Sequence, residues 1–236
     1  MAPSSNFDED GRLPWFVSNR FEDALEAQRY VLALFEGTLR ERLGFDLLAD
    51  VQLLTPTRKG PLGVDALNVL LQRLVQRKLR GIDVLPPPPG RRPEFLLGAR
   101  VRQTRNNYDL GVMNGAIGVV TFAGARRGEL VVRYDQGEVA YTPENEGARD
   151  LSLAYALTIH KSQGSEFPCV VVVMHKAHTF MHHRNLFYTA VTRAKETAIV
   201  VGDAWGMRHC AQTEQVERRK TFLSVLDLPR FGGDRR

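Results

Sequence analysis

The sequence has little cysteine and no long apolar run. Its two cysteines, Cys169 and Cys210, are too few for a disulfide framework and favour a reducing compartment. No segment approaches the roughly 20 consecutive apolar residues that a membrane-spanning helix requires. Residues 1–6 have neither the basic region nor the apolar region of a secretory signal. These absences predict a cytoplasmic location.

The sequence also lacks one widespread nucleotide-binding device. No lysine follows a glycine, so there is no glycine-rich loop that ends in Gly-Lys-Ser or Gly-Lys-Thr and cradles the phosphates of a nucleotide. The acidic run Asp8-Glu9-Asp10 follows no apolar strand, so we do not expect it to hold magnesium. The sequence therefore lacks this particular means of holding nucleotide phosphates.

What is present fits a folded protein with an anionic partner. Hydrophobic residues make up 43% of the sequence and charged residues 25%, which is ordinary for a globular domain. The net charge is +5, and the isoelectric point is about 9.4. This positive balance favours nucleic acid as the partner.

Two stretches of the chain have the texture of an α/β domain with a covered parallel sheet. The apolar run CVVVVM at residues 169–174 suits a strand that is buried on both faces. In the first stretch we expect an edge strand at residues 14–17, a helix at 21–43, a strand at 51–54, and a helix from Gly63 to Gly81. In the second we expect strands at residues 153–159, 169–174 and 198–201, and helices at 185–195 and 208–226.

A region of different character separates these stretches. It follows the polyproline segment at residues 85–90, which marks a boundary. Short strands at residues 99–103, 117–122, 130–134 and 138–141, separated by turn-prone segments, predict a small SH3-like β-barrel. We therefore expect residues 13–90 and 149–228 to form one discontinuous domain, residues 91–148 to form the barrel, and residues 1–12 and 229–236 to be a disordered lead-in and a tail.

Three polar segments carry the candidate chemistry. The loop Thr55-Pro56-Thr57-Arg58-Lys59-Gly60 combines small hydroxyls, a glycine and two cations, which suits a phosphate. The stretch from Thr158 to Glu166, TIHKSQGSE, packs donors, a cation and a carboxylate between two apolar strands, where polar loops commonly form sites. In the helix at residues 185–195, Arg193 projects from a polar face, for which a simple salt bridge is the alternative interpretation. We expect such loops at the carboxyl ends of the strands.

The three segments together resemble a known series of motifs. TPTRKG, then TIHKSQGSEF, then YTAVTRAK are similar to motifs four, five and six of superfamily 1 helicases, in the RecD-like branch. That branch also inserts an SH3-like barrel between motifs four and five. The resemblance extends over residues 13–203. It implies the second, RecA-like motor domain of an ATP-dependent DNA helicase, with a usual direction of travel of 5′ to 3′.

The resemblance also implies roles for individual residues. Arg193 matches an arginine finger that reaches the γ-phosphate of ATP, and Arg58 matches a second arginine near that phosphate; a fixed guanidinium is worth about 10³-fold in rate. We expect Arg58, Glu166 and Arg193 to converge on one wall of the fold. The nucleotide cleft would be lined by Gln163, Gly164 and Glu166. The single-stranded DNA track would include Thr55, Asn68, Thr158, His160, Lys161 and Ser162. ATP and Mg²⁺ would both require the first motor domain, so we expect no ATP hydrolysis by this chain alone.

Two alternatives remain open. The chain could be a stand-alone binder of single-stranded nucleic acid, because the barrel carries cations and an aromatic side chain of the kind that such binders use. These barrel residues are Arg100, Arg102, Arg105, Tyr108, Arg126, Arg127 and Arg133. The other alternative is a metal site, for which the histidines at 175, 178, 182 and 183 have tolerable spacing, with Cys169 and Cys210 on either side. We expect a packing role for these histidines and no metal.

Overall fold

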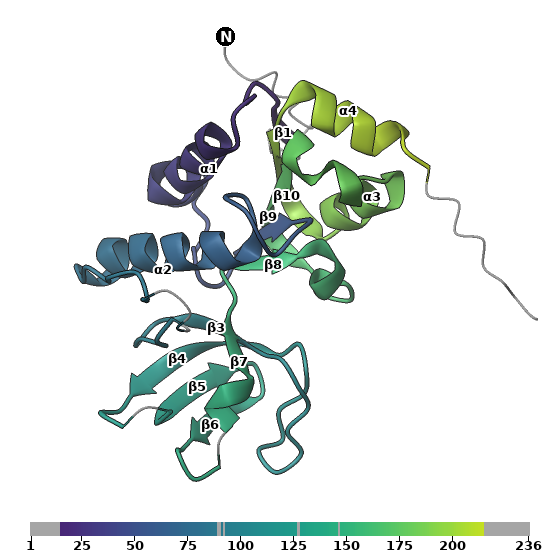
Figure 1. Ribbon diagram of the computed structural model, residues 1–236. Helices are drawn as coiled ribbons and strands as arrows, with labels where there is room; N and C mark the ends of the chain where they lie inside the picture. Colours follow the sequence, from purple (N-terminus) through teal and green to yellow (C-terminus); the bar gives the residue numbers. More distant parts are fainter. Residues whose placement is uncertain (1–14, 89–90, 92, 127, 146, 215–236) are drawn as a thin grey trace, which may run out of the picture.

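The computed structural model describes residues 15–88, 91, 93–126, 128–145 and 147–214. The expected lead-in, the expected tail, and part of the polyproline segment lie outside these residues. The chain folds into a mixed α/β structure with two five-stranded sheets, one parallel and one antiparallel, which lie one above the other in Figure 1. Within the described part of the chain, no helix is both long enough and apolar enough to cross a membrane.

The parallel sheet has the strand order β1-β10-β9-β2-β8. The five strands are Trp15–Ser18 (β1), Val51–Thr55 (β2), Ala156–Thr158 (β8), Phe167–Met174 (β9) and Ala194–Gly202 (β10). The run of valines in β9 places this strand at the centre of the sheet, where it pairs with β10 on one side and β2 on the other. The expectation of a covered central strand is therefore confirmed, as is the edge position of β1.

Helices cover both faces of the parallel sheet, and alternate residues of each strand point to opposite faces. On one face, Val171 and Val173 belong to the same apolar cluster as residues of Ala24–Ala33 (α1) and Val64–Arg80 (α2). On the other face, Val170 and Val172 join residues of Arg184–Val191 (α3) and Ala204–Gln212 (α4). Figure 1 shows the two helix pairs on opposite sides of the sheet.

The antiparallel sheet has the order β6-β5-β4-β3-β7. Its strands are Arg100–Gln103 (β3), Ile117–Ala123 (β4), Leu130–Tyr134 (β5), Gly137–Tyr141 (β6) and Leu151–Leu153 (β7). The first four agree closely with the expected strands. The fifth lies beyond residue 148, where the barrel was expected to end, so this sheet extends further along the chain than the sequence indicated.

Arg100 joins the two sheets. Its guanidinium donates a hydrogen bond to the Val51 carbonyl of β2 and lies 5.8 Å from the centre of the Phe167 ring. The side chain is buried, and this burial lowers the pKa of Arg100 to about 10, so it remains charged at neutral pH. The apolar cluster that includes Val171 also continues into the antiparallel sheet through Val101 and Val132. The two sheets thus share one core.

The boundaries of the helices differ from expectation in three places. The expected helix at residues 21–43 begins at Ala24, where the Asp23 side chain accepts hydrogen bonds from two backbone N–H groups, and changes after Ala33 into the π-helix Leu34–Arg42. The expected helix at residues 185–195 ends at Val191, because Ala194 and Lys195 already belong to β10. The last helix starts at Ala204, four residues early, because Asp203 caps it through the Gly206 N–H. Residues 215–226 of the expected helix lie outside the described part.

The predicted strand at residues 153–159 is wrong as a single element. The chain leaves the antiparallel sheet after β7 and enters the parallel sheet at β8. Between them, the carbonyls of Ala154 and Tyr155 accept hydrogen bonds from the buried Gln52 amide at 3.3 and 3.1 Å. One apolar run therefore serves two sheets, which periodicity alone does not reveal.

Candidate functional site

The loop after β2 is held in a fixed shape by its own backbone. The Thr55 hydroxyl is buried and donates to the Leu62 carbonyl at 2.7 Å. The Asp65 N–H donates to the Arg58 carbonyl at 3.0 Å. A side chain at Gly63 would lie 2.4 to 2.5 Å from the Lys59 and Arg58 carbonyl oxygens, so only glycine permits this close return of the chain. The loop thereby fixes the backbone from which Arg58 projects.

Arg58 shares its surroundings with two other cations. Its guanidinium forms an ion pair with Asp65 at 3.2 Å, and both side chains are largely exposed. Partial burial lowers the pKa of Lys161, and the nearby charges of Arg102 and Arg58 lower it further, whereas Asp65 opposes them. We call Arg58, Lys161 and Arg102 the basic patch. It combines the loop after β2, the segment after β8, and a strand of the antiparallel sheet.

The segment between β8 and β9 crosses from one end of the parallel sheet to the other. It begins with the short 3₁₀-helix Ile159–Ser162, in which the buried Ser162 hydroxyl donates to the Ile159 carbonyl at 2.8 Å. A turn follows at Gly164, which has a φ of +83°. His160, Lys161, Gln163, Gly164 and Glu166 are exposed along it. The crossover thus has exposed polar groups throughout its length.

Arg193 is tied to the far end of this crossover. Its Nη1 donates to the Ser165 carbonyl at 3.2 Å, and its Nε donates to the Thr189 carbonyl at 3.2 Å. The Arg193 carbonyl in turn accepts a hydrogen bond from the Phe167 N–H at 2.8 Å. Among the described residues, the Arg193 side chain is therefore oriented by backbone carbonyls, and no carboxylate forms the salt bridge of the alternative interpretation.

Glu166 is a neighbour of Arg193 at this end. Its carboxylate is exposed and lies 3.8 Å from the Lys195 ammonium. Phe167 and Ala194 are partners at the start of β9 and β10, so the residues immediately before them are brought side by side. Sequence reasoning placed Glu166 and Arg193 together, and the structure does so through the register of these two strands.

Arg58 does not join that pair. It follows the carboxyl end of β2, whereas Glu166 and Arg193 immediately precede the amino ends of β9 and β10 in the same parallel sheet. Within the described part of the chain, no hydrogen bond or ion pair connects Arg58 with either residue. The expected convergence of all three side chains is therefore wrong for Arg58. The expectation that all three polar segments lie at the carboxyl ends of strands is also wrong. The crossover carries Glu166 to the amino ends of the strands, where Arg193 lies as well.

Three of the expected DNA contacts have polar groups that already have internal partners. Besides Thr55 and Ser162, the Asn68 amide donates to the Ala156 carbonyl at 2.9 Å and accepts from the Ala156 N–H at 2.8 Å. All three side chains are buried. In this structure they fix β2, β8 and the crossover in place, and a direct contact with a ligand through these groups is not available. Thr158 is partly exposed, and His160 and Lys161 are exposed.

The candidate residues of the antiparallel sheet also divide by burial. Tyr108 is highly exposed on the loop that follows β3. Arg102 is buried, its Nη2 lies 3.3 Å from the Asn114 side-chain oxygen, and burial lowers its pKa. Arg100 is buried between the sheets, so it is a structural residue rather than a surface cation. Arg105, Arg126 and Arg133 are exposed, and Arg127 lies outside the described residues.

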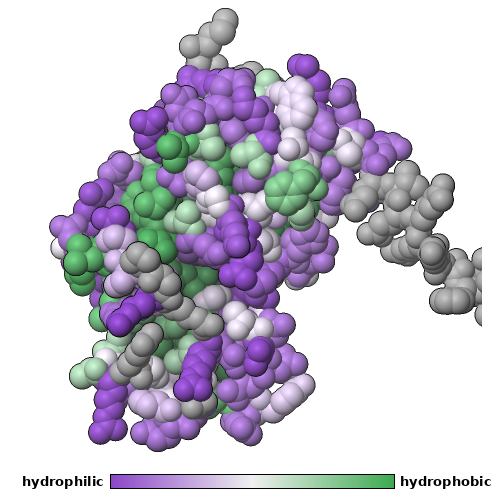
Figure 2. Space-filling view, viewed as in Figure 1, coloured by the Kyte–Doolittle hydropathy of each residue, from purple (hydrophilic) through white to green (hydrophobic). Residues whose placement is uncertain are grey.

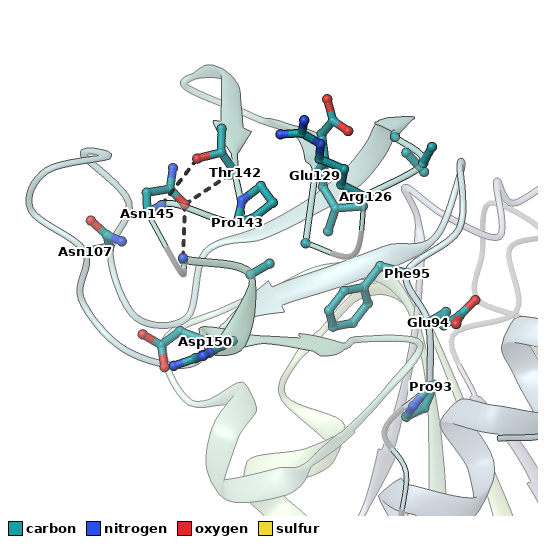
Figure 3. A pocket seen from close by; sticks show the side chains of 18 of the residues that line it. Pro93, Glu94, Phe95, Asn107, Arg126, Glu129, Thr142, Pro143, Asn145 and Asp150 are labelled. Carbon is teal, nitrogen blue, oxygen red and sulfur yellow. Dashed lines mark hydrogen bonds between the residues drawn. The ribbon is translucent and has the colours of Figure 1, made fainter. Parts of the chain in front are cut away.

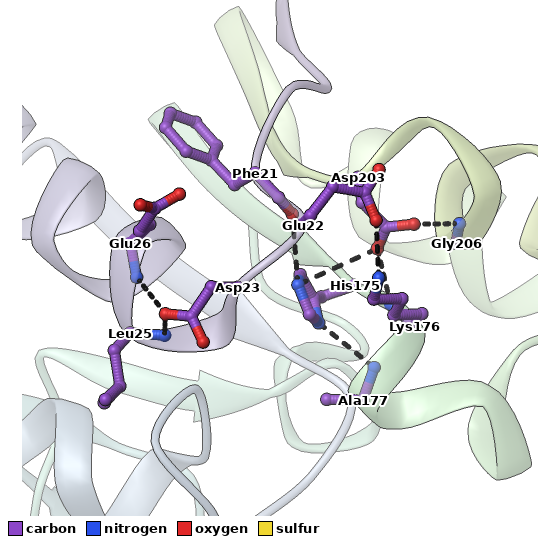
Figure 4. A network of polar contacts seen from close by, with 10 residues as sticks. All are labelled: Phe21, Glu22, Asp23, Leu25, Glu26, His175, Lys176, Ala177, Asp203 and Gly206. Carbon is purple, nitrogen blue, oxygen red and sulfur yellow. Dashed lines mark hydrogen bonds and ion pairs between the residues drawn. The ribbon is translucent and has the colours of Figure 1, made fainter.

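The histidines form a packed group at the carboxyl ends of β9 and β10. His175 accepts from the Ala177 N–H through Nδ1, so its Nε2 carries the proton and donates to the Phe21 carbonyl at 3.1 Å. Figure 4 shows this contact beside Asp203, which accepts from the Lys176 and Gly206 N–H groups. His183 accepts from the Leu186 N–H and caps α3. Within the described residues, no group of three or more potential ligands is placed to hold a metal ion.

One cavity lies beside two of the candidate residues of the antiparallel sheet, Arg105 and Arg126. It measures about 1030 Å³ and opens beside the antiparallel sheet, where Phe95, Arg126, Glu129, Pro143 and Asn145 are among the residues that line it (Figure 3). The candidate residues of the three polar segments do not line it. Sequence reasoning gave no signal for this cavity, because it is formed by segments that are far apart in the chain.

Sequence comparison identifies the family. The sequence model of the UvrD-like helicase C-terminal domain matches residues 153–201. An ATP-dependent RecD2 DNA helicase from Deinococcus radiodurans is 42% identical over 175 residues, which make up 73% of this chain and 23% of that protein. A RecBCD enzyme subunit RecD from Mycolicibacterium smegmatis is 36% identical over 190 residues, which make up 80% of this chain and 31% of that protein. The chain belongs to the RecD-like helicases.

This RecD-like chain spans less than a third of the length of these curated relatives. The family match runs from β7 to β10, and so contains both Glu166 and Arg193, whereas Arg58 lies before it. A solved structure of the Pif1 helicase from Bacteroides in complex with ADP-AlF3 and ssDNA is 17% identical, with a TM-score of 0.46. The alignment covers 88% of this chain and 53% of the Pif1 chain. That similarity adds nothing to the family assignment.

Proposed function

We propose that this chain supplies the second motor domain of an ATP-dependent DNA helicase. The observation that carries the proposal is the hydrogen bond between Arg193 and the Ser165 carbonyl. It joins a candidate arginine finger to the same crossover that exposes His160 and Lys161 at its other end. One continuous segment therefore connects a candidate nucleotide contact with a candidate DNA contact, which is what a motor needs.

The nucleotide side of the proposal consists of Arg193, Glu166, Gln163 and Gly164. A guanidinium held by carbonyl groups is pre-oriented, so it can stabilise the charge that develops on a transferred phosphoryl group. The exposed Glu166 carboxylate can accept a hydrogen bond from a ribose hydroxyl. ATP and Mg²⁺ would be held chiefly by a first motor domain, because this sequence has no glycine-rich phosphate loop.

The DNA side of the proposal consists of Arg58 and Lys161, the exposed cations of the basic patch, with Thr158, His160 and Tyr108; the buried Arg102 would act on the strand only through its charge. Cations contact the phosphates of a single strand and an exposed aromatic ring can stack on a base. Thr55, Asn68 and Ser162 would position these groups rather than contact DNA. Direction of travel from 5′ to 3′ is part of this proposal through the family resemblance, as is an SH3-like character for the antiparallel sheet with residues 91–148.

The role of Arg58 is the part of the proposal that the structure changes most. The resemblance assigns it to the γ-phosphate, but here it pairs with Asp65 and follows β2, whose last residue lies beside Thr158 at the start of the segment that carries Lys161. We assign Arg58 to a phosphate of the single strand. An Arg58→Ala variant should then bind single-stranded DNA more weakly. A loss of ATP turnover with unchanged DNA affinity would contradict this assignment and place Arg58 at the nucleotide instead.

A chimera tests the motor function directly. The chain would be joined behind the first motor domain of the Deinococcus radiodurans relative, and DNA-stimulated phosphate release would be measured. Arg193→Ala should reduce turnover by about 10³-fold while DNA affinity changes little. The isolated 236 residues should show no turnover. Hydrolysis by the isolated chain, or full turnover by the Arg193→Ala chimera, would contradict the proposal.

A second candidate function is a stand-alone binder of single-stranded nucleic acid. The observation that favours it is the exposure of Arg105, Arg126 and Arg133 together with Tyr108 on the antiparallel sheet. Replacing the three arginines by glutamine, with Lys161 and Arg193 intact, separates the two functions. A pure binder should lose nearly all affinity, whereas a motor domain should keep the part that the basic patch provides.

A further inference from the structure

The basic patch contains one acidic side chain that opposes its cations. Asp65 lies in the first turn of α2 and pairs with Arg58 at 3.2 Å. Its charge also acts on Lys161, against the effects of Arg102 and Arg58. The ion pair is largely exposed, with the Arg58 and Asp65 side chains 68% and 54% accessible. An anion from solution that approaches Arg58 therefore meets the negative charge of this carboxylate beside it.

The backbone around Asp65 offers little help to an incoming anion. The start of a long helix commonly attracts phosphate through its free N–H groups. Here the N–H groups of Gly63, Val64 and Asp65 donate to the carbonyls of Gly60, Thr57 and Arg58. Recognition of a phosphate at this place therefore depends on side-chain cations, and the state of Arg58 matters more than it would at an open helix end.

We infer that Asp65 is a displaceable counter-ion that occupies Arg58 in the free protein and must give way when a phosphate of single-stranded DNA binds. This inference rests on the proposed function. It adds a specific residue that limits affinity: each time a phosphate leaves Arg58, the Asp65 carboxylate takes its place. A strand would then be held less tightly and released faster than Arg58 and Lys161 would allow without Asp65.

The size of the effect follows from simple electrostatics. A unit charge about 5 Å from a phosphate costs about 1 kcal/mol in a medium close to water. This corresponds to a change of about 5-fold in affinity, because 1.4 kcal/mol is a factor of ten. Salt screens such a contribution, so the effect should be largest at low ionic strength.

The test compares two variants of the same chain with a fluorescent oligothymidine. Asp65→Asn removes the counter-ion. Glu36→Gln is the matched control, because Glu36 also forms an exposed ion pair at 3.2 Å, with Arg77, outside the patch. Each variant loses one negative charge. Asp65→Asn should tighten binding by about 3- to 10-fold at about 50 mM salt, and Glu36→Gln by much less. Thermal unfolding of both variants checks that the fold is kept.

A third variant identifies the cation involved. In an Arg58→Ala background, Asp65→Asn should give less than half of its original gain, since the two side chains act on each other. An equal effect of Asp65→Asn and Glu36→Gln overturns the inference, and so does a gain that is unchanged without Arg58. Absence of any binding by the unaltered chain instead overturns the proposed DNA contact itself, so the two failures are distinguishable.

Discussion

The parallel and antiparallel sheets each have five strands, yet the residues of the two sheets differ in how deeply they are buried. In the parallel sheet, β9 is buried along nearly its whole length, and helices cover both faces. In the antiparallel sheet, β4 alternates buried and partly exposed positions, and β6 is mostly exposed. Figure 2 shows hydrophilic side chains over much of the visible surface, with apolar residues gathered beside α1 and α2.

This difference places the candidate residues in two physical settings. Around the parallel sheet, Arg58 and Arg193 project from backbone that hydrogen bonds hold in place. On the antiparallel sheet, Tyr108 lies on an exposed loop, and a cavity of about 1030 Å³ opens beside this sheet. A rigid backbone suits Arg193, which we propose to meet a reacting phosphate, whereas an exposed loop suits contacts with a variable strand. The predictions below test this comparison.

The largest expected effect is on the parallel sheet. A Cβ atom at Gly202 would lie 1.6 Å from the Met174 carbonyl oxygen, so Gly202→Ala must push β9 and β10 apart. We expect a loss of more than about 3 kcal/mol in the free energy of unfolding, measured by urea denaturation. The control is Gly137→Ala in the β5–β6 turn, where φ is +129° but no atom is close, with an expected loss of about 1 to 2 kcal/mol. Equal losses would remove the contrast between the sheets.

The next effect concerns the junction. Arg100→Met removes the hydrogen bond to the Val51 carbonyl and leaves that carbonyl without this donor. We expect a loss of about 2 kcal/mol and separate thermal transitions for the two sheets, detected by calorimetry. Arg133→Met, at an exposed position of β5, should change stability by less than about 0.5 kcal/mol. A single unshifted transition for Arg100→Met would show that the shared apolar core is sufficient.

Acid should weaken the histidine group beside the parallel sheet. Burial lowers the pKa of His178 and His182 to about 4, with smaller contributions from neighbouring histidines, against an ordinary value of 6.5. Both are therefore neutral in the folded chain, and the unfolded chain binds protons first as the pH falls. The free energy of unfolding should decrease between about pH 6.5 and pH 4, by on the order of 1 kcal/mol for each histidine.

Denaturation midpoints measured at several pH values in this window provide the test. The test variant is His182→Leu, which leaves in place the groups that face this side chain, namely His175, His209 and Asp203. In this variant the free energy of unfolding should decrease less over the same pH window. A decrease that is unchanged in this variant would assign it to other groups.

The smallest effect distinguishes the two settings in DNA binding. Tyr108→Ala should weaken binding of a single strand by about 1 kcal/mol, equally at all salt concentrations, because stacking is not ionic. Lys161→Ala should weaken binding mainly at low salt and reduce the slope of affinity against salt by about 1. Fluorescence anisotropy over a salt series measures both. A change of slope for Tyr108→Ala would mean that the loop acts through its charges instead.

Much of the fold could be predicted from local pattern. The apolar run of β9 and the apolar stripe of α2 with its terminal Gly81 are strong signals, and both elements lie where expected. The four short strands from β3 to β6 were also found from turns and alternation. Element ends were less predictable: α3 stops at Val191 because Ala194 pairs with Phe167, and this pairing depends on a strand that is distant in the sequence.

The candidate site shows the same limit more sharply. The sequence indicated Arg58, Glu166 and Arg193 as chemically active types, but could not say which of them would meet. It also gave no reason to select Asp65, because an acidic residue in the first turn of a helix is ordinary. The Ser165 carbonyl that orients Arg193 is a backbone group, so its role cannot be inferred from the residue type at that position.

The sequence by itself determined the secondary-structure texture, the order of the motifs and the family, because these depend on local periodicity and on residue identity. Tertiary structure alone decided that the crossover brings Glu166 beside Arg193 at one end of the parallel sheet, while the segments that carry Arg58 and Lys161 follow the paired ends of β2 and β8 at the other. The physical reason is strand direction: parallel strands require each connection to return along the whole sheet, so residues a few positions apart lie at opposite ends.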